Sequence, residues 1–175
     1  MAPLHLIQTI TGARILGDLT FRLAGQGDLP AILALLRDDR LGAGRENAPS
    51  AAYERAFARL LDEPDNHLIL GEIDAMAVAT YQLTFITGLS LGATRRAQIE
   101  SVRVAASMRG AGIGARMFAD AETRARAAGC ALLQLTTNAT RTDARAFYER
   151  LGFTPTHIGF KRQISPAEDA PCPMT

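Results

Sequence analysis

Residues 99–114, IESVRVAASMRGAGIG, decide the fold of this chain. The β-rich run over 99–104 predicts a strand, and a helical pattern begins at Ile113 and continues to residue 128. Between them, alternating glycines remove side chains from a turn, so that successive N–H groups can converge on one anion. The new helix directs the positive end of its dipole at the same place. This order predicts a phosphate or pyrophosphate site, to which Arg109 adds a cation.

Other interpretations of the glycine turn are a connection without a ligand, a dinucleotide-binding turn and a P-loop. A dinucleotide-binding turn needs a third glycine where this chain has Met117, and no acidic residue ends the next predicted strand. A P-loop needs a Gly-Lys-Ser/Thr sequence after the turn, which is absent. A simple connection stays open on the turn alone.

Composition limits the partners and the compartment. The net charge of +1, without a basic tract, argues against nucleic acid and against an anionic membrane surface. No apolar run is long enough to span a bilayer and the first residues lack a signal-peptide pattern, so we expect a cytoplasmic protein. Cys130, Cys172 and the scattered histidines fit no metal-binding spacing, and we expect no metal.

The element pattern predicts an α/β (α+β) fold in a single domain over 1–175, with an N-terminal extension over 1–18 and a flexible tail over 165–175. We expect a mixed, mostly antiparallel sheet of six to seven strands, flanked by about four helices. The predicted strands are 19–23, 67–73, 76–85, 99–104 and 131–137, with one or two more over 153–164, and the predicted helices are 29–36, 51–61, 113–128 and 143–151.

Three segments together resemble a known family. The first is the strand followed by residues 109–114, which match R/Q-x-x-G-x-G/A; the second is a strand that ends at Asn138. The third, residues 143–153, matches A-x-x-F-Y-E-x-L-G-F. In this order they resemble the GNAT superfamily of N-acetyltransferases. The resemblance covers 97–153, and the N-terminal half shares only the order of its elements.

The resemblance implies acetyl-CoA as cosubstrate and a parallel pair of strands that splay apart. The pantetheine arm would lie in that gap and pair with strand backbone groups, and the pyrophosphate would rest on the N–H groups of the turn. The implied cofactor-binding residues are Val102, Val104, Arg109, Gly110, Ala111, Gly112, Ile113, Gly114, Ala115, Asn138 and Tyr148.

Acetyl transfer to an amine needs a deprotonated amine, a donor for the oxyanion and a proton for the leaving thiolate. By resemblance Tyr148 is the general acid, since its phenol, with a reference pKa of about 10, stays protonated at neutral pH. Glu100 is the candidate base, acting through water, and strand alternation places it on the face of Val102 and Val104 unless a bulge intervenes. The alternatives are a packed aromatic for Tyr148, a solvated Glu100 and an Asn138 that caps a strand end.

The acceptor is expected to be a primary amine of a small molecule, acetylated by direct attack in a ternary complex. Candidate acceptor-binding residues are Arg45 and Glu46 in the loop after the first helix, and Gln82 and Phe85 at the end of a central strand. Three other functions stay open: a non-catalytic acyl-CoA-binding regulatory module, a protein N-acetyltransferase, and a structural partner protein with the same fold. A homodimer is compatible with the sequence.

Overall fold

The computed structural model describes residues 18–38 and 44–164. The chain divides into two compact units, residues 1–135 and residues 136–175. The predicted tail, Cys172 and nearly all of the predicted N-terminal extension lie outside the described residues.

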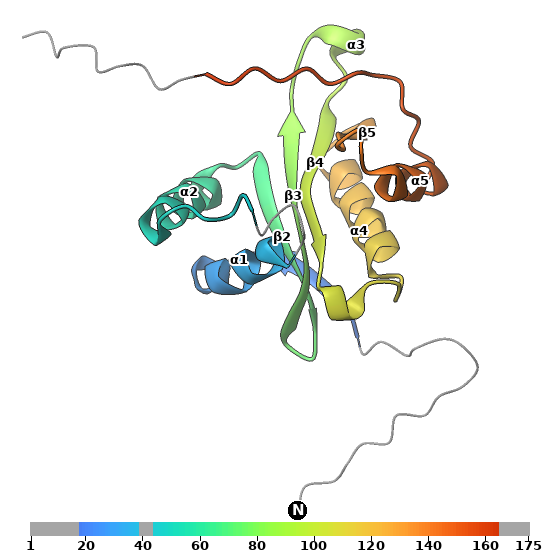
Figure 1. Ribbon diagram of the computed structural model, residues 1–175. Coiled ribbons are helices and arrows are strands. Elements are labelled where there is room, and N and C mark those ends of the chain that lie inside the picture. The colour runs from blue at the N-terminus through green and yellow to red at the C-terminus, as the bar shows by residue number, and fades with distance from the viewer. Residues whose placement is uncertain (1–17, 39–43, 165–175) are drawn as a thin grey trace, which may run out of the picture. The chain divides into compact units, whose positions relative to one another are not determined.

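The first unit contains one mixed sheet with the strand order β1-β2-β3-β4-β5 (Figure 1). Neighbouring strands are antiparallel from β1 to β4, and β4 pairs with β5 in parallel, which confirms the predicted class of sheet. The count of six to seven strands is wrong, because the described residues form five. The strands are β1 (Thr20–Leu23), β2 (Asn66–Ile73), β3 (Met76–Ile86), β4 (Arg96–Val104) and β5 (Leu132–Leu135).

Helices α1 and α2 cover one face of this sheet and α4 covers the other (Figure 1). On the first face, Phe57 of α2 and Ile32 of α1 pack with Leu68 and Leu70 of β2 in one buried cluster. The helices are α1 (Leu29–Arg37), α2 (Ser50–Asp62), α3 (Ser90–Ala93), α4 (Ile113–Ala127) and α5 (Thr142–Arg150), with short 3-10 turns at η1 (Gln26–Asp28) and η2 (Ala106–Met108).

A buried polar network fixes α4 against β3. The hydroxyl of Tyr81, a fully buried residue, donates to the carboxylate of Asp120, which also accepts a 2.7 Å hydrogen bond from Nε of Arg124. Burial of the phenol and its bond to Asp120 raise the pKa of Tyr81 above its ordinary value, so the hydroxyl remains a donor. The helix that begins at the glycine turn is therefore anchored to the middle of the sheet.

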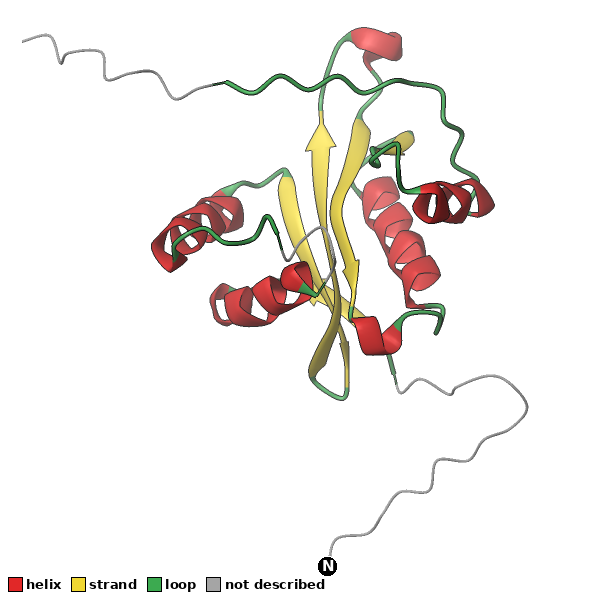
Figure 2. Cartoon of the chain, in the orientation of Figure 1, coloured by secondary structure: helices red, strands yellow, loops and turns green. Residues whose placement is uncertain are grey.

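The second unit contains α5 and the loop that follows it (Figure 2). The helix ends where predicted, with Gly152 in the left-handed region at φ 88°. The strands predicted over 153–164 are wrong, because that segment forms no strand and exposes Ile158 and Phe160. Alternating apolar residues show that a segment can pair, but a strand forms only where another strand supplies its backbone partners.

No helix in 18–38 or 44–164 combines the length and the apolar character that a bilayer crossing requires.

Candidate active site

A β-bulge interrupts β4 next to the glycine turn. Gln82 lies opposite Glu100 and Thr80 lies opposite Arg103, so the one β3 residue between them faces two residues of β4. One of the two, Ser101, has φ 51°, a left-handed conformation that is uncommon outside glycine. A bulge bends its strand and redirects the side chains that follow it.

The bulge separates Glu100 from Val104. Glu100 pairs with Gln82 and Val104 with Ala79, and these two β3 residues are three positions apart, so their side chains lie on opposite faces. Gln82 pairs with Leu68, a core residue beneath α1 and α2. Glu100 therefore lies on the α1/α2 face. The expectation that Glu100 and Val104 share a face is wrong because the inserted residue shifts the alternation.

Beyond Ile99, β4 has a free edge. Its parallel pairing with β5 ends where Ile99 meets Leu135, whereas β4 continues to Val104. In the described residues no strand pairs with this edge over 100–104. Within the described residues, 100–104 of β4 therefore have no parallel neighbour, and the splayed pair of strands that the resemblance implied stays a prediction.

The backbone groups of Val102 and Val104 face that edge. The N–H of Ala105 donates to the carbonyl of Val78 at 2.9 Å, and residues of an antiparallel ladder bond alternately to their partner and away from it. Val104 and Val102 are the outward members of this alternation. The carbonyl of Val102 accepts a 2.9 Å bond from the Arg103 guanidinium, as an outward group can.

The glycine turn presents N–H groups at the start of α4. Gly110 and Gly112 both have φ 80°, and a Cβ atom on either would meet no atom within 4 Å. Gly112 precedes the helix without a side-chain cap, and the first turn contains no acidic residue. Within 110–115, only the N–H of Ala111 has a partner among the described residues, a 3.4 Å bond to a preceding carbonyl. The other N–H groups are open to an anion.

Arg109 holds the turn in place. Its Nε donates to the carbonyl of Val104 at 3.2 Å, and its Nη2 donates to the carbonyl of Asp38 at the end of α1. The Asp38 carboxylate in turn accepts a 2.6 Å bond from the N–H of Ala106. The Arg109 guanidinium thus joins β4, the end of α1 and the glycine turn. A phosphate would bind to the guanidinium N–H groups that do not take part in these bonds.

Tyr148 and Asn138 lie in the second unit. The half-buried Tyr148 ring packs edge-to-face against Phe147, with centroids 5.5 Å apart, and against Phe153 at 6.3 Å. Oδ1 of Asn138 accepts bonds from the N–H and the hydroxyl of Thr140, at 2.9 and 2.8 Å, in the turn before α5. The Tyr148 contacts fit the packing alternative. The expectation that Asn138 ends a strand is wrong, because β5 ends at Leu135 and Asn138 lies in the turn before α5. The acid role of Tyr148 and the cofactor contact of Asn138 stay predictions.

The structure separates the two acceptor candidates on β3. Gln82 lies on the α1/α2 face, where its Nε2 donates to Oδ1 of Asn66 at 2.8 Å. Phe85, three residues on, lies on the other face and is only 7% exposed. Its ring packs against His67, 5.0 Å between centroids, and beneath the Arg95 guanidinium at 5.3 Å. Phe85 therefore belongs to the core.

The candidates in the α1–α2 loop differ from each other. Glu46 is tied to both helices, since its carbonyl accepts a 3.0 Å bond from Arg37 and its carboxylate a 3.3 Å bond from the Tyr53 hydroxyl. Arg45 is exposed. Glu46 thus connects α1 and α2 through hydrogen bonds, a role that the sequence did not reveal.

A row of polar side chains that the sequence did not reveal crosses the α1/α2 face. Asn66, Thr84, Gln98 and Gln134 lie in register on β2, β3, β4 and β5. Thr84 donates to Asn66 at 3.0 Å and Gln134 to Gln98 at 2.7 Å. The signal was present in β3, where polar residues alternate with apolar ones toward the strand end. Such a row offers hydrogen bonds to a polar ligand.

Neither a metal cluster nor an activated thiol occurs in the described part of the chain. No group of three or more His, Cys, Asp or Glu side chains there could hold a metal ion. Burial raises the pKa of the Cys130 thiol, which opposes formation of a thiolate nucleophile.

The profile of the Acetyltransferase (GNAT) family matches residues 29–153. The chain belongs to the GNAT family. It is an acetyltransferase by this membership, and the resemblance found in the sequence is confirmed. The β4 bulge, the free strand edge and the glycine turn all lie within the matched residues of this GNAT protein.

Several individual proteins are similar to this chain in sequence or in structure. An aminoalkylphosphonate N-acetyltransferase from Salmonella typhimurium is 33% identical over 117 residues, which are 65% of this chain and 73% of that protein. The crystal structure of a Bacillus halodurans protein described as a transcriptional regulator is similar, with a TM-score of 0.80 and 39% identity over 84% of this chain and all of that one. An acetyltransferase of Trypanosoma brucei is 25% identical, with a TM-score of 0.68, over 84% of this chain and all of that one.

Proposed function

We propose that this GNAT protein transfers the acetyl group of acetyl-CoA to a primary amine of a small molecule by direct attack in a ternary complex. The observation that carries the proposal is the succession of a free β4 edge and an uncapped α4 N-terminus within one short stretch of chain. A flexible thioester arm and a pyrophosphate need such a pair of surfaces, one that offers strand backbone groups and one that offers convergent N–H groups.

The residues of the first unit have distinct tasks in this proposal. The outward backbone groups of Val102 and Val104 pair with the pantetheine arm, and the N–H groups of 110–115 bind the pyrophosphate. The N–H of Val102 donates to the oxyanion that forms when the amine attacks the thioester carbonyl. The arginine bond at the Val102 carbonyl has to yield when the arm pairs there.

Proton transfers complete the reaction. The exposed Glu100 carboxylate has no hydrogen-bond or ion-pair partner within 18–38 and 44–164, and it attracts the ammonium and accepts its proton through water. As the carbon–sulfur bond breaks, Tyr148 donates its phenolic proton to the thiolate and regains one from solvent. No acetyl group passes through the protein, which agrees with the raised pKa of the Cys130 thiol.

The acceptor class comes from a relative. The Salmonella protein is named for aminoalkylphosphonates and is 33% identical to this chain. We therefore propose a small amine that also carries an acidic group, with aminoalkylphosphonates as the first acceptors to test.

A second candidate function is a non-catalytic acyl-CoA-binding module. The Bacillus halodurans relative, at 39% identity, is described as a transcriptional regulator, which favours this candidate. Such a module would keep the glycine turn but would need neither Glu100 nor Tyr148.

One experiment separates the two functions. The purified protein is mixed with acetyl-CoA and a panel of amines, free thiol is followed with time, and the product is weighed by mass spectrometry. Amine-dependent thiol release with an acetylated product supports the enzyme. At a concentration of a hundred times its Kd, acetyl-CoA raises the unfolding free energy of a protein that binds it by about 2.7 kcal/mol, which is seen as a thermal shift. Such a shift without thiol release from any amine would support the binding module. If there is neither thiol release nor a thermal shift, both candidate functions are contradicted.

A further inference from the structure

Glu100 has a polar neighbour directly across the sheet. Gln82 of β3 pairs with Glu100 of β4, so the two side chains lie on the same face with their Cβ atoms about 5 Å apart. Glu100 is exposed and Gln82 is half-buried, so both side chains are accessible on the α1/α2 face. A small ligand bound to one of these side chains is therefore within reach of the other.

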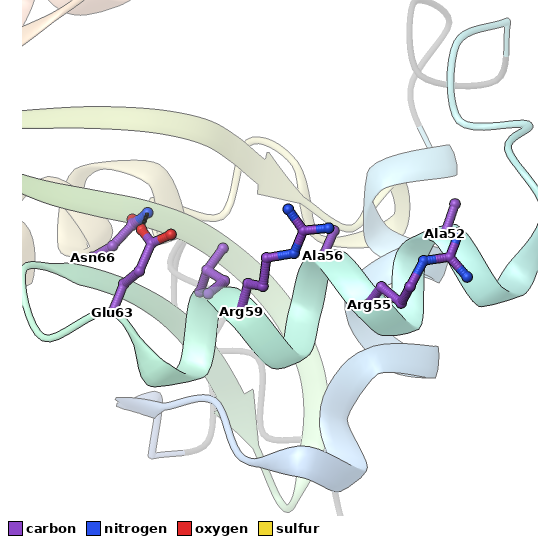
Figure 3. A pocket seen from close by; sticks show the side chains of 7 residues that line it. Ala52, Arg55, Ala56, Arg59, Glu63 and Asn66 are labelled. Atoms are coloured by element: carbon purple, nitrogen blue, oxygen red, sulfur yellow. Dashed lines mark hydrogen bonds between the residues drawn. The ribbon is translucent and has the colours of Figure 1, made fainter. Parts of the chain in front are cut away.

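A chain of hydrogen bonds determines which end of the Gln82 amide is free. An ionised carboxylate can only accept, and that of Glu63 accepts a 2.9 Å bond from Nδ2 of Asn66, the two side chains lying together at the end of α2 (Figure 3). Oδ1 of Asn66 is then the acceptor for Nε2 of Gln82, at 2.8 Å. Oε1 of Gln82 receives no hydrogen bond from any described residue. The free atom of Gln82 is therefore an acceptor beside a carboxylate.

Two neighbouring acceptors suit an amine. An ammonium group has only N–H donors, and the negative charge of Glu100 attracts it. After the amine has lost a proton it has two N–H donors and one lone pair. An N–H that is bonded to the amide oxygen of Gln82 fixes the direction of this lone pair. Gln82 would thus position the amine without carrying its proton.

A donor lies one step away on β4. Gln98 is two residues before Glu100 on the same face, about 6.6 Å along the strand. Its Oε1 accepts a 2.7 Å bond from Nε2 of Gln134, and both N–H groups of its own Nε2 lack a partner in the described part of the chain. Arg96, two residues before Gln98 on this face, adds positive charge on the side away from Glu100. Gln98 therefore offers its N–H groups to an acidic oxygen.

We propose that Gln82, Glu100 and Gln98 form the acceptor site. Gln82 and Glu100 bind the amine, and Gln98 donates to an oxygen of the acidic group of the same acceptor. The spacing of the side chains along β4 suits an amine nitrogen and an oxygen about three or four bonds apart. This inference rests on the proposed acetyl transfer and adds the residues that select the acceptor.

The test of Gln98 compares 2-aminoethylphosphonate with propylamine, in which a methyl group replaces the phosphonate. Gln98→Met keeps the length of the side chain and removes its N–H donors. It lowers kcat/KM for the aminophosphonate about tenfold, mainly through KM, because a hydrogen bond to a charged oxygen is lost. Its kcat/KM for propylamine stays within about twofold, since that amine has no oxygen to bind.

The test of Gln82 uses the same two amines. Gln82→Met removes an acceptor that both amines use, so kcat/KM falls about tenfold for both, while the Kd of CoA stays within about twofold. The matched control is Gln26→Met, which makes the same chemical change at an exposed position in η1 and changes neither amine.

Each contrary outcome has a definite meaning. Equal losses for both amines in Gln98→Met, or no loss for either, would overturn the oxygen contact, and native kinetics in Gln82→Met would overturn the amine contact. If the native protein acetylates no amine, the proposed function fails, and calorimetry with 2-aminoethylphosphonate still tests the site. Binding that both variants weaken supports the acceptor site, whereas no binding to the native protein overturns it.

Discussion

The N-termini of α1 and α4 are built in opposite ways. At α1, Asp28 places a carboxylate beside the first turn, and Pro30 removes one N–H that would lack a partner. The same carboxylate accepts a 2.7 Å bond from the N–H of Gly25 and pairs with Arg22 at 2.6 Å. At α4, Gly112 supplies no charge and no proline follows it in the first turn, whereas neither helix has a hydrogen bond from a capping side chain to its first N–H groups.

The difference separates a helix end that serves the fold from one that serves a ligand. At the C-terminal end of α4 the backbone groups have partners within the protein. The N–H of Gly129, which has φ 74°, donates to the carbonyl of Arg126, and the N–H of Cys130 donates to the carbonyl of Ala125, both at 2.9 Å. Only at 110–115 does α4 leave its backbone groups to something outside the described chain. The proposed function therefore depends on what binds to that end of the helix.

Filling the open end gives the largest effect. In Gly112→Val the side chain occupies space that is empty in the protein, so its clash is with the ligand. Loss of about three charge-assisted hydrogen bonds at ~1.5 kcal/mol each corresponds to a roughly 1,000-fold weaker binding of CoA. Isothermal calorimetry measures this change.

Gly129→Val is the matched control for backbone strain. Its residue has a similar positive φ and an equally open Cβ position, so both variants lose about 1–3 kcal/mol of unfolding free energy. The control keeps its CoA affinity. Equal affinities in the two variants would contradict the assignment of the turn.

The second effect separates binding from chemistry. Tyr148→Phe removes the proton donor but leaves the α4 turn intact, so kcat falls about 100-fold while the Kd of CoA stays within about twofold. The nearby Phe147→Leu variant controls for the packing of this aromatic cluster. A native kcat in Tyr148→Phe would remove the phenol from the mechanism.

A third variant makes α4 resemble α1. Ala115→Glu places an acid on an exposed position of the first turn, where the helix dipole increases the unfolding free energy by about 0.3–1 kcal/mol. The same charge repels the pyrophosphate, and CoA binding weakens about tenfold. Ala119→Glu, one turn further on and also exposed, changes both quantities much less. A variant that gains stability and keeps its affinity would contradict an anion at this end.

The smallest effect concerns α1. The Arg22 guanidinium, by its hydrogen bonds, holds the pKa of the Asp28 carboxyl below its ordinary value of 3.8. The resulting stability is therefore complete above that pH and is lost as the pH falls through the folded-state pKa. Asp28→Asn lowers the unfolding free energy by about 1 kcal/mol at neutral pH, and the gap to the native protein narrows below about pH 4. Urea titrations check this, with CoA affinity unchanged at neutral pH.

The sequence predicted the features that depend on neighbouring residues. The helices expected over 29–36 and 113–128 and the strands expected over 67–73 and 76–85 are confirmed as α1, α4, β2 and β3. The open α4 turn could also be predicted, because glycines at alternate positions have no side chains to close it. Each of these needs only a short stretch of chain.

Features that depend on pairing were beyond the sequence. Ser101 has a positive φ without being glycine, because β4 inserts a residue opposite one position of β3. Glu100 therefore changes its relation to Val104, and no local pattern shows this. The C-terminal apolar alternation at Ile158 and Phe160 is typical of a strand, but those side chains are exposed and unpaired.

The central claim is that the bare amides of the α4 turn bind the pyrophosphate of CoA. Its most direct test is a titration of CoA into nitrogen-15-labelled protein, followed by amide resonances. The account predicts that the signals of Gly110 and of residues 112–115 shift on binding and exchange more slowly with water, while those at the start of α1 do not. Saturating CoA that leaves the 110–115 amides unchanged would contradict it.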